Sequence, residues 1–299
     1  MSVSRHPVAL SLERQVGGAT RLLATVMALP LVDGIFPALV ITGALSTATG
    51  IVETGLLIFG GSATVAVILA EMDGSPREQA RAILLLGAVL VPLAAAEATV
   101  APTIQSLLDM GVFQRFAGVV ILAVAAKTAS STVGDYLPRP AVIIGLGLVA
   151  AVRPLDAHLA VSADPWLVLR AAAAAGVGVA FALAVALLGP RLRGAVDIDR
   201  FRFGSSVALG MLALSVLKLM PTKAPVALGV LAVTAAFSFD PGAAEPRAER
   251  ATDAGPTEAG NRTEPVVADG GDDADDARDD GDARGRGDHG DEQSRAPWL

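Results

Sequence analysis

Long apolar segments separated by short polar breaks occupy most of the chain, from Leu22 to Phe239. Ala171–Gly189 contains no ionisable residue, and Leu22–Leu45 contains only Asp33. A membrane-spanning helix needs about 20 mostly apolar residues. The segments that approach this pattern are Leu22–Leu45, Thr54–Ala70, Ala82–Ala101, Met110–Lys127, Leu137–Val152, Ala171–Gly189, Phe203–Leu217 and Ala224–Phe239.

This pattern predicts an all-α fold, a polytopic transmembrane helix bundle of about eight spans. The segments do not alternate apolar and polar residues, as the strands of a membrane barrel would. Leu137–Val152 is short, and segments of its length also form re-entrant or half-spanning helices. Seven spans plus one re-entrant segment is therefore an alternative.

The composition changes abruptly at Asp240, and this change predicts two domains. Residues 240–299 contain 17 acidic and 7 basic residues and carry a net charge of −10, whereas residues 1–239 carry +3. The acidic stretch has too few large apolar residues to offset the entropy lost on ordering. We therefore expect a transmembrane helical domain over residues 1–239 and a disordered acidic tail over residues 240–299.

The distribution of Arg and Lys predicts the orientation in a cell membrane. With the first residue inside, eight spans place eleven basic residues of the membrane domain on the cytoplasmic side and five outside. Both termini are then cytoplasmic. Met1–Arg21 is polar and mixed and shows no cleavable signal peptide, so the first apolar run is interpreted as a span.

Asp33 is the sharpest chemical lead, because an ionisable residue within a span is costly to insert. Gly34 follows it, and Pro30 and Pro37 flank it. Pro37 lacks the amide that would bond back to Asp33, which predicts a kinked or broken helix. Transporters build ion and substrate sites at such breaks. The alternative is that Asp33 caps the second half-helix.

Glu97, Lys127 and Lys218 are further candidate residues for transport or ion binding. Glu97 lies in the third predicted span. Its side chain is either functional or simply hydrated at the membrane–water interface. Lys127 and Lys218 end apolar runs, where long side chains can also extend to the headgroups. Glu53 and Glu71 flank the second predicted span and are interpreted as boundary residues.

Two sequence echoes indicate an internal repeat. Phe59-Gly60-Gly61-Ser62 is echoed by Phe203-Gly204-Ser205-Ser206. The apolar runs that end at Lys127 and Lys218 are each followed by two prolines and another apolar segment. Inverted repeats are a recurring transporter architecture, although such echoes also arise by chance in Ala- and Gly-rich sequence.

Several function classes have no candidate residues. The chain has no cysteine, and its three histidines lie outside the predicted spans, so no thiolate or membrane-embedded histidine site is available. We expect no enzyme activity, no cofactor and no metal site. The acidic tail would repel phosphates, so nucleic acid is not an expected partner. The sequence does not indicate an oligomeric state.

Three stretches carry a resemblance to known proteins: Leu29 to Leu39, Gly60 to Ala66 and Ala125 to Ser130. They resemble a haloarchaeal family of multi-pass membrane proteins of unknown function. That resemblance covers about residues 1–240 and implies a host and a location, but no activity. An acid in a proline-interrupted early span is also weakly similar to the lysine-exporter and tellurium-resistance membrane proteins. The Arg-dominated composition and acidic tail indicate the same high-salt archaeal host.

Two functions from different classes fit these residues. The first is transport or export of an ion or small solute, with Asp33 as a proton or cation carrier and Glu97 as a second acid. The alternative is a non-transporting membrane scaffold or sensor whose acidic tail binds cytoplasmic partners. In both cases the lipid bilayer is the expected environment.

Overall fold

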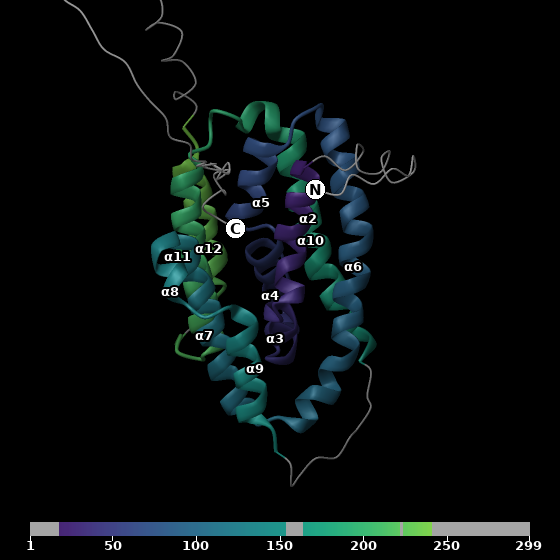
Figure 1. The fold of residues 1–299 in the computed structure, drawn as a ribbon, viewed down its shortest axis with the longest axis vertical. Coiled ribbons are helices and arrows are strands. Elements are labelled where there is room, and N and C mark those ends of the chain that lie inside the picture. Colours follow the sequence, from purple (N-terminus) through teal and green to yellow (C-terminus); the bar gives the residue numbers. More distant parts are fainter. Residues whose placement is uncertain (1–17, 154–163, 222–223, 241–299) are drawn as a thin grey trace, which may run out of the picture. The chain divides into compact units, whose positions relative to one another are not determined.

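The computed structural model describes residues 18–153, 164–221 and 224–240, all of which belong to one compact unit (Figure 1). Every regular element within these ranges is a helix, which confirms the all-α prediction. Except for Asp240, the predicted tail lies outside the described residues. His158 also lies outside them, in the gap after Arg153.

The first apolar segment forms an interrupted helix, α2 (Gly18–Val32) followed by α3 (Ile35–Ile41), with a bend of 41° between the two parts. The break falls at Asp33 and Gly34. Gly34 has φ 75°, a left-handed conformation that glycine adopts without strain. The predicted helix break is therefore confirmed, because Gly34 allows the turn and Pro37 cannot donate to Asp33.

A second interrupted helix runs through α4 (Ala48–Thr54), the π-helical turn η2 (Gly55–Phe59), α5 (Ser62–Ala66) and the π-helical turn η3 (Val67–Glu71). It bends by 52° at Gly60 and Gly61. Glycine at these positions also lets neighbouring helices approach closely. A Cβ on Gly60 would lie 2.7 Å from Cδ1 of Phe181.

Two long helices, α6 (Pro76–Leu107) and α10 (Pro165–Leu192), pack against each other in opposite directions. Gln79 near the start of α6 lies close to Gly189 near the end of α10, and Gly87 packs against Val179. Alanine and glycine fill the buried face of α10. Small side chains allow this close approach, as expected for helices packed within a membrane.

The remaining helices form two hairpins. The first contains α7 (Met110–Ala129), the short helix α8 (Ser131–Tyr136) and α9 (Pro140–Ala151). The second contains α11 (Ile198–Val216) and α12 (Val226–Ser238). In Figure 1 the interrupted helices lie between the α6–α10 pair and the two hairpins, and their contacts with both groups agree with this view.

In each hairpin, backbone hydrogen bonds join the residues before its first helix to the residues after its last helix. We call this the closed end of the hairpin. In the first, the Asp109 N–H donates to the Ala151 carbonyl (2.7 Å) and the Arg153 N–H to the Leu107 carbonyl (3.0 Å). In the second, the Asp197 N–H donates to the Ser238 carbonyl (2.8 Å), and the Asp240 N–H to the Ala195 carbonyl (2.7 Å). Because α6 and α10 lead into the hairpins in opposite directions, the two closed ends face opposite ways.

The hairpins correspond to the second echo in the sequence, in which a helix, a proline-containing connection and a short helix follow one another. The first echo does not mark equivalent positions. Phe59 ends a π-helical turn of the second interrupted helix, whereas Phe203 lies within α11.

The prediction of about eight spans is not confirmed. Among the described residues, three helices (α6, α7 and α10) are long and apolar enough to cross a membrane, and the two bent pairs raise the number to five at most. Helix α9 has 12 residues and α12 has 13. They are therefore only about 18–20 Å long, against about 30 Å of hydrocarbon. Leu137–Val152, which the sequence left open between a span and a re-entrant segment, is one of these short helices.

Candidate functional site: an acidic side chain at each short helix

Asp33 lies partly buried at the break between α2 and α3. Its N–H donates to the Leu29 carbonyl (2.8 Å), so its backbone still belongs to α2. The N-cap of α3 is Gly34, and no side chain caps that helix. The Asp33 carboxylate is therefore not the cap of the second half-helix, which removes the structural alternative considered from the sequence.

Two cations lie within electrostatic range of Asp33. The positive charges of Lys127, in the last turn of α7, and Arg139, at the start of α9, both act on its carboxylate. Among the described residues neither forms an ion pair with Asp33. Gly34 also lies against Ile144 of α9, with 3.5 Å from its notional Cβ to the Ile144 side chain. The first interrupted helix therefore meets the first hairpin at this site.

Of the predicted residues, the structure thus brings together Asp33 and Lys127 and adds Arg139. Sequence reasoning had counted Arg139 only among the basic residues on the cytoplasmic side. The proline on either side of it was a usable signal, because Pro140 at the first helical position marks Arg139 as the residue that begins α9.

Glu97 and Lys218 lie apart from this group. One carboxylate oxygen of Glu97, Oε2, is buried in α6 with no hydrogen-bond partner in the described residues. Lys218 follows α11 with φ 56°, and its N–H donates to the Ser215 carbonyl (3.0 Å). This left-handed residue ends the helix, and its positive charge suits a helix C-terminus.

Glu53 differs from Glu71 in a way that sequence reasoning did not predict. It lies inside the bundle with 9% of its surface exposed. Its carboxylate lies near the backbone N–H groups of Ala227 and Leu228 in the first turn of α12. Glu71, at the other end of the same interrupted helix, is exposed as expected. No local signal separated the two, since the neighbours of Glu53 are distant in sequence.

The short helices α9 and α12 begin near the middle of the bundle's length. Leu217, just beyond α11, packs on Gly118, which lies only about 12 Å from the start of α7. Adding the length of α11 puts the two closed ends about 40 Å apart, close to the thickness of a bilayer with its headgroups. Helices α9 and α12, with 12 and 13 residues, end at opposite ends of the bundle and therefore both begin near the middle of its length.

The arrangement is consequently the same at both short helices. Each has an amino end at which unpaired N–H groups and the helix dipole give a partial positive charge. Each lies near an acidic residue of an interrupted helix. Helix α9 packs on α3 and on Gly34, next to Asp33, and Glu53 lies near the first turn of α12. Within the described ranges, no group of three Asp, Glu or His side chains could hold a metal ion.

Comparison with known proteins gives one match. Residues 90–217 match a family of unknown function, DUF5794. The matched region covers α7 to α11 and the second half of α6. It includes the Ala125 to Ser130 stretch but neither of the two earlier stretches that carried the resemblance. It is consistent with an uncharacterised family and shows neither a haloarchaeal origin nor a likeness to lysine exporters. No curated protein and no solved structure matches the chain.

Proposed function

We propose that this protein is a membrane transporter or exporter of an ion or small solute, with Asp33 as the carrier residue. One observation carries the proposal: an ionisable side chain lies at the break of an interrupted helix and does not cap it. Interrupted helices leave backbone groups free to bind ions or substrates. Acidic residues within a membrane cost free energy to insert, and they commonly mark the path of an ion or substrate. Glu97, with its unpaired buried oxygen, is the second acid of this proposal.

We further propose that the chain lies in a cell membrane with both termini in the cytoplasm. Seven described arginines lie toward the end of the bundle where α6 begins, and three lie toward the opposite end, which supports this orientation. The first group is Arg21, Arg77, Arg81, Arg191, Arg193, Arg200 and Arg202, and the second is Arg115, Arg153 and Arg170.

In this arrangement four segments cross the membrane: α2–α3, α4–α5, α6 and α10. Neither hairpin crosses the membrane. Each enters and leaves through a single face, the first hairpin through the outer face and the second through the cytoplasmic face. Their closing hydrogen bonds support this topology, because they return the chain to its point of entry. We retain a halophilic archaeon as the proposed host, on the basis of the Arg-rich and acidic composition.

The test is flux into vesicles that contain the purified full chain, measured across a panel of ions and small solutes for wild type and Asp33→Asn. Asparagine keeps the size of the side chain and removes its charge. A lost charged contact is worth about 1.5–3 kcal/mol, so coupled flux should fall by about tenfold or more. Because Gly34 is the N-cap of α3, folding and insertion should stay unchanged.

Glu71→Gln, at the exposed end of the second interrupted helix, is the matched control and should transport like wild type. An Asp33→Asn variant with wild-type flux would refute the carrier role. Absence of flux for every compound in the wild-type protein would instead favour the membrane scaffold or sensor with a partner-binding tail.

A further inference from the structure

The two hairpins are closed in the same hydrogen-bond register. In each, an aspartate is the N-cap of the first helix, and its N–H donates to the carbonyl of the last residue of the short helix. These pairs are Asp109 with Ala151 and Asp197 with Ser238. A second bond in each joins the carbonyl two residues before the aspartate to the N–H two residues after the short helix. The second hairpin therefore repeats the first in the opposite direction.

A side chain just before each hairpin holds the end of an interrupted helix. Gln105, four residues before the N-cap of α7, donates from Nε2 to the Ile41 carbonyl at the end of α3 (2.7 Å). Arg193, four residues before the N-cap of α11, donates from Nη2 to the Met72 carbonyl just after η3 (2.6 Å). Helix α3 packs on α6, α7 and α9, whereas the second interrupted helix packs on α10 and α11. Each hairpin is thus matched with one long helix and one interrupted helix.

The two helix breaks meet inside the bundle. Phe36 lies two residues after Gly34, and Phe59 lies immediately before Gly60. Both aromatic rings are fully buried, and their centroids are 5.1 Å apart. A change in the bend at one break therefore displaces the ring that packs against the other break. Packed side chains of this kind can carry coupling between distant sites.

We propose that the chain consists of two inverted repeats that exchange conformations, with the Gln105–Ile41 contact as the outer gate and the Arg193–Met72 contact as the inner gate. The first repeat contains α2–α3, α6 and the first hairpin, and the second contains the second interrupted helix, α10 and the second hairpin. Opening one gate changes the bend of its interrupted helix, and the ring contact between the breaks keeps the other gate closed. Both gates are closed in this structure.

This inference rests on the proposed function and specifies how a carried ion or solute reaches each side of the membrane. In transporters built from inverted repeats, one repeat moves against the other around a fixed site, which opens to one side at a time. The outer and inner gates lie at opposite ends of the bundle, as this kind of access requires.

Two buried alanines can report on the gates, because the chain has no cysteine. Ala38 lies in α3 before the outer gate, and Ala66 lies in α5 before the inner gate. We call Ala38→Cys the outer reporter and Ala66→Cys the inner reporter. The full chain with both reporters is reconstituted in vesicles and reacted with a bulky, impermeant maleimide from one side at a time.

Mutual exclusion of the two openings is the expected result. An adduct on the outer reporter holds the outer gate open, so it should slow the reaction of the inner reporter from the opposite side about tenfold or more. An adduct on the inner reporter should slow the outer reporter in the same way. The matched control carries the inner reporter alone, and the same first treatment should leave its rate unchanged.

Variants of the gates test which side chains hold them. Methionine keeps much of the length of these side chains and removes the donor. Gln105→Met should speed the reaction of the outer reporter about fivefold, and Arg193→Met should speed the inner reporter about tenfold, because a charged donor is lost. Gln114→Met in α7 and Arg191→Met in α10 are the matched controls. Among the described residues neither side chain has a hydrogen bond to an interrupted helix, so the rates should not change.

Gln79→Met provides a second inner variant if Arg193→Met does not fold. Nε2 of Gln79 also donates to the Met72 carbonyl (2.7 Å), so its loss should speed the inner reporter about fivefold. The exclusion test itself needs no gate variant.

An inner reporter that reacts at its original rate after modification of the outer reporter would overturn the proposal. Gate variants that leave both reporters unchanged would also overturn it. Labelling detects access and not flux, so the two proposals can fail separately. Mutual exclusion in a protein that carries no tested compound would support the exchange and count against transport, whereas flux without exclusion would do the reverse.

Discussion

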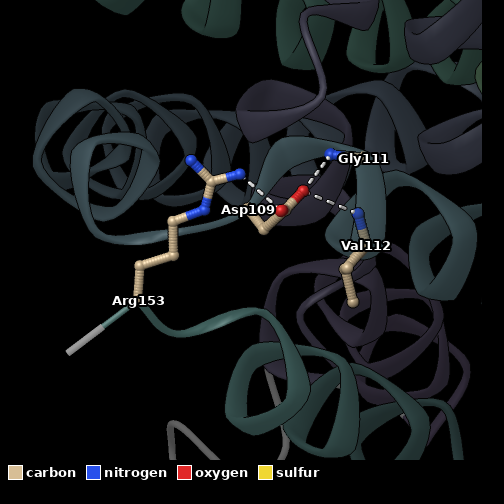
Figure 2. Close-up of polar contacts among 4 residues, drawn as sticks. All are labelled: Asp109, Gly111, Val112 and Arg153. Atoms are coloured by element: carbon tan, nitrogen blue, oxygen red, sulfur yellow. Dashed lines mark hydrogen bonds and ion pairs between the residues drawn. The ribbon is translucent and has the colours of Figure 1, made fainter. Parts of the chain in front are cut away.

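Asp109 shows how one side chain closes a hairpin at the edge of the bundle. Its carboxylate accepts hydrogen bonds from the Gly111 and Val112 N–H groups and pairs with the guanidinium of Arg153 (Figure 2). The first two contacts begin α7, and the third fastens the chain segment that follows α9. A single residue thus caps one helix of the hairpin and holds the end of the other.

The contribution of Asp109 to stability should depend on pH in a defined direction. The Arg153 hydrogen bond, followed by the Val112 N–H, holds the pKa of Asp109 below its ordinary value of 3.8. A depressed pKa in the folded state means that the stabilisation is complete above that ordinary value and is lost as pH falls through the lowered pKa. At neutral pH, Asp109→Asn should therefore be less stable than wild type, because it loses the ion pair.

Thermal unfolding at a series of pH values measures this difference. The gap between wild type and Asp109→Asn should be constant near neutrality and close only in acid below about pH 4. Asp135→Asn, on the exposed face of α8, is the control and should unfold like wild type. A gap that persists unchanged in strong acid would contradict the ion-pair explanation.

At the scale of elements, the α10 helix meets the second interrupted helix through small residues. A Cβ on Gly178 would lie 2.3 Å from Cβ of Phe59 and 3.1 Å from the Gly55 carbonyl oxygen. These atoms belong to or adjoin the backbone of η2, so they cannot turn away. The π-helical turn and the glycine of α10 therefore fit each other as a pair.

Gly178→Ala should destabilise the bundle by about 1–3 kcal/mol, the usual cost of overpacking a close contact. Gly176→Ala, on the same helix, meets nothing within 4 Å and should be neutral or more stable by up to about 1 kcal/mol. The thermal unfolding midpoints of the two variants in one detergent provide the comparison. Equal midpoints would show that this helix contact is loose.

At the scale of the whole molecule, the proposed orientation can be tested because the chain has no cysteine. Single cysteines at the exposed positions Ser46 and Ser106 should react with an impermeant reagent added outside intact cells. Cysteines at Asp73 and Asp199, at the opposite end of the bundle, should react only after lysis. Reaction of Asp199→Cys from outside would reverse the orientation.

These positions avoid Gly74 and Gly194, which connect elements at the same end as Asp73 and Asp199. Their φ angles are 91° and 82°, so a cysteine there would strain the turn.

The boundary of the membrane domain predicts where the chain can be cut. Truncation after Pro241 keeps the Asp240 N–H bonded to the Ala195 carbonyl, so the second hairpin stays closed. The truncated protein should insert and unfold like the full chain.

Truncation after Phe237 is the matched comparison. It removes the Ser238 carbonyl and the Asp240 N–H, the two groups that close the hairpin. At about 1 kcal/mol for each hydrogen bond, it should lose about 2 kcal/mol of stability. Membrane extraction followed by thermal unfolding measures both variants. Loss of the bundle after the first cut would show that the acidic tail packs against it.

The sequence alone determined the features that depend on neighbouring residues. Every apolar segment is a helix, because apolar residues without alternation favour that geometry in a membrane. The break at Asp33 and Gly34 was predictable because Pro37 removes an amide and glycine accepts a left-handed turn. The residues responsible, Asp33, Gly34 and Pro37, lie within about one helical turn of one another.

Only the tertiary structure decided the features that depend on residues distant in sequence. Glu53 looked like Glu71 at the end of an apolar run, and packing inside the bundle buried it. Arg139 likewise joined Asp33 only because α9 lies against α3. Whether an apolar segment crosses the bilayer was also undecided, because hydropathy records how apolar a helix is and not the depth at which it begins. Hydrogen bonds between chain segments place the ends of α9 and α12 at opposite ends of the bundle.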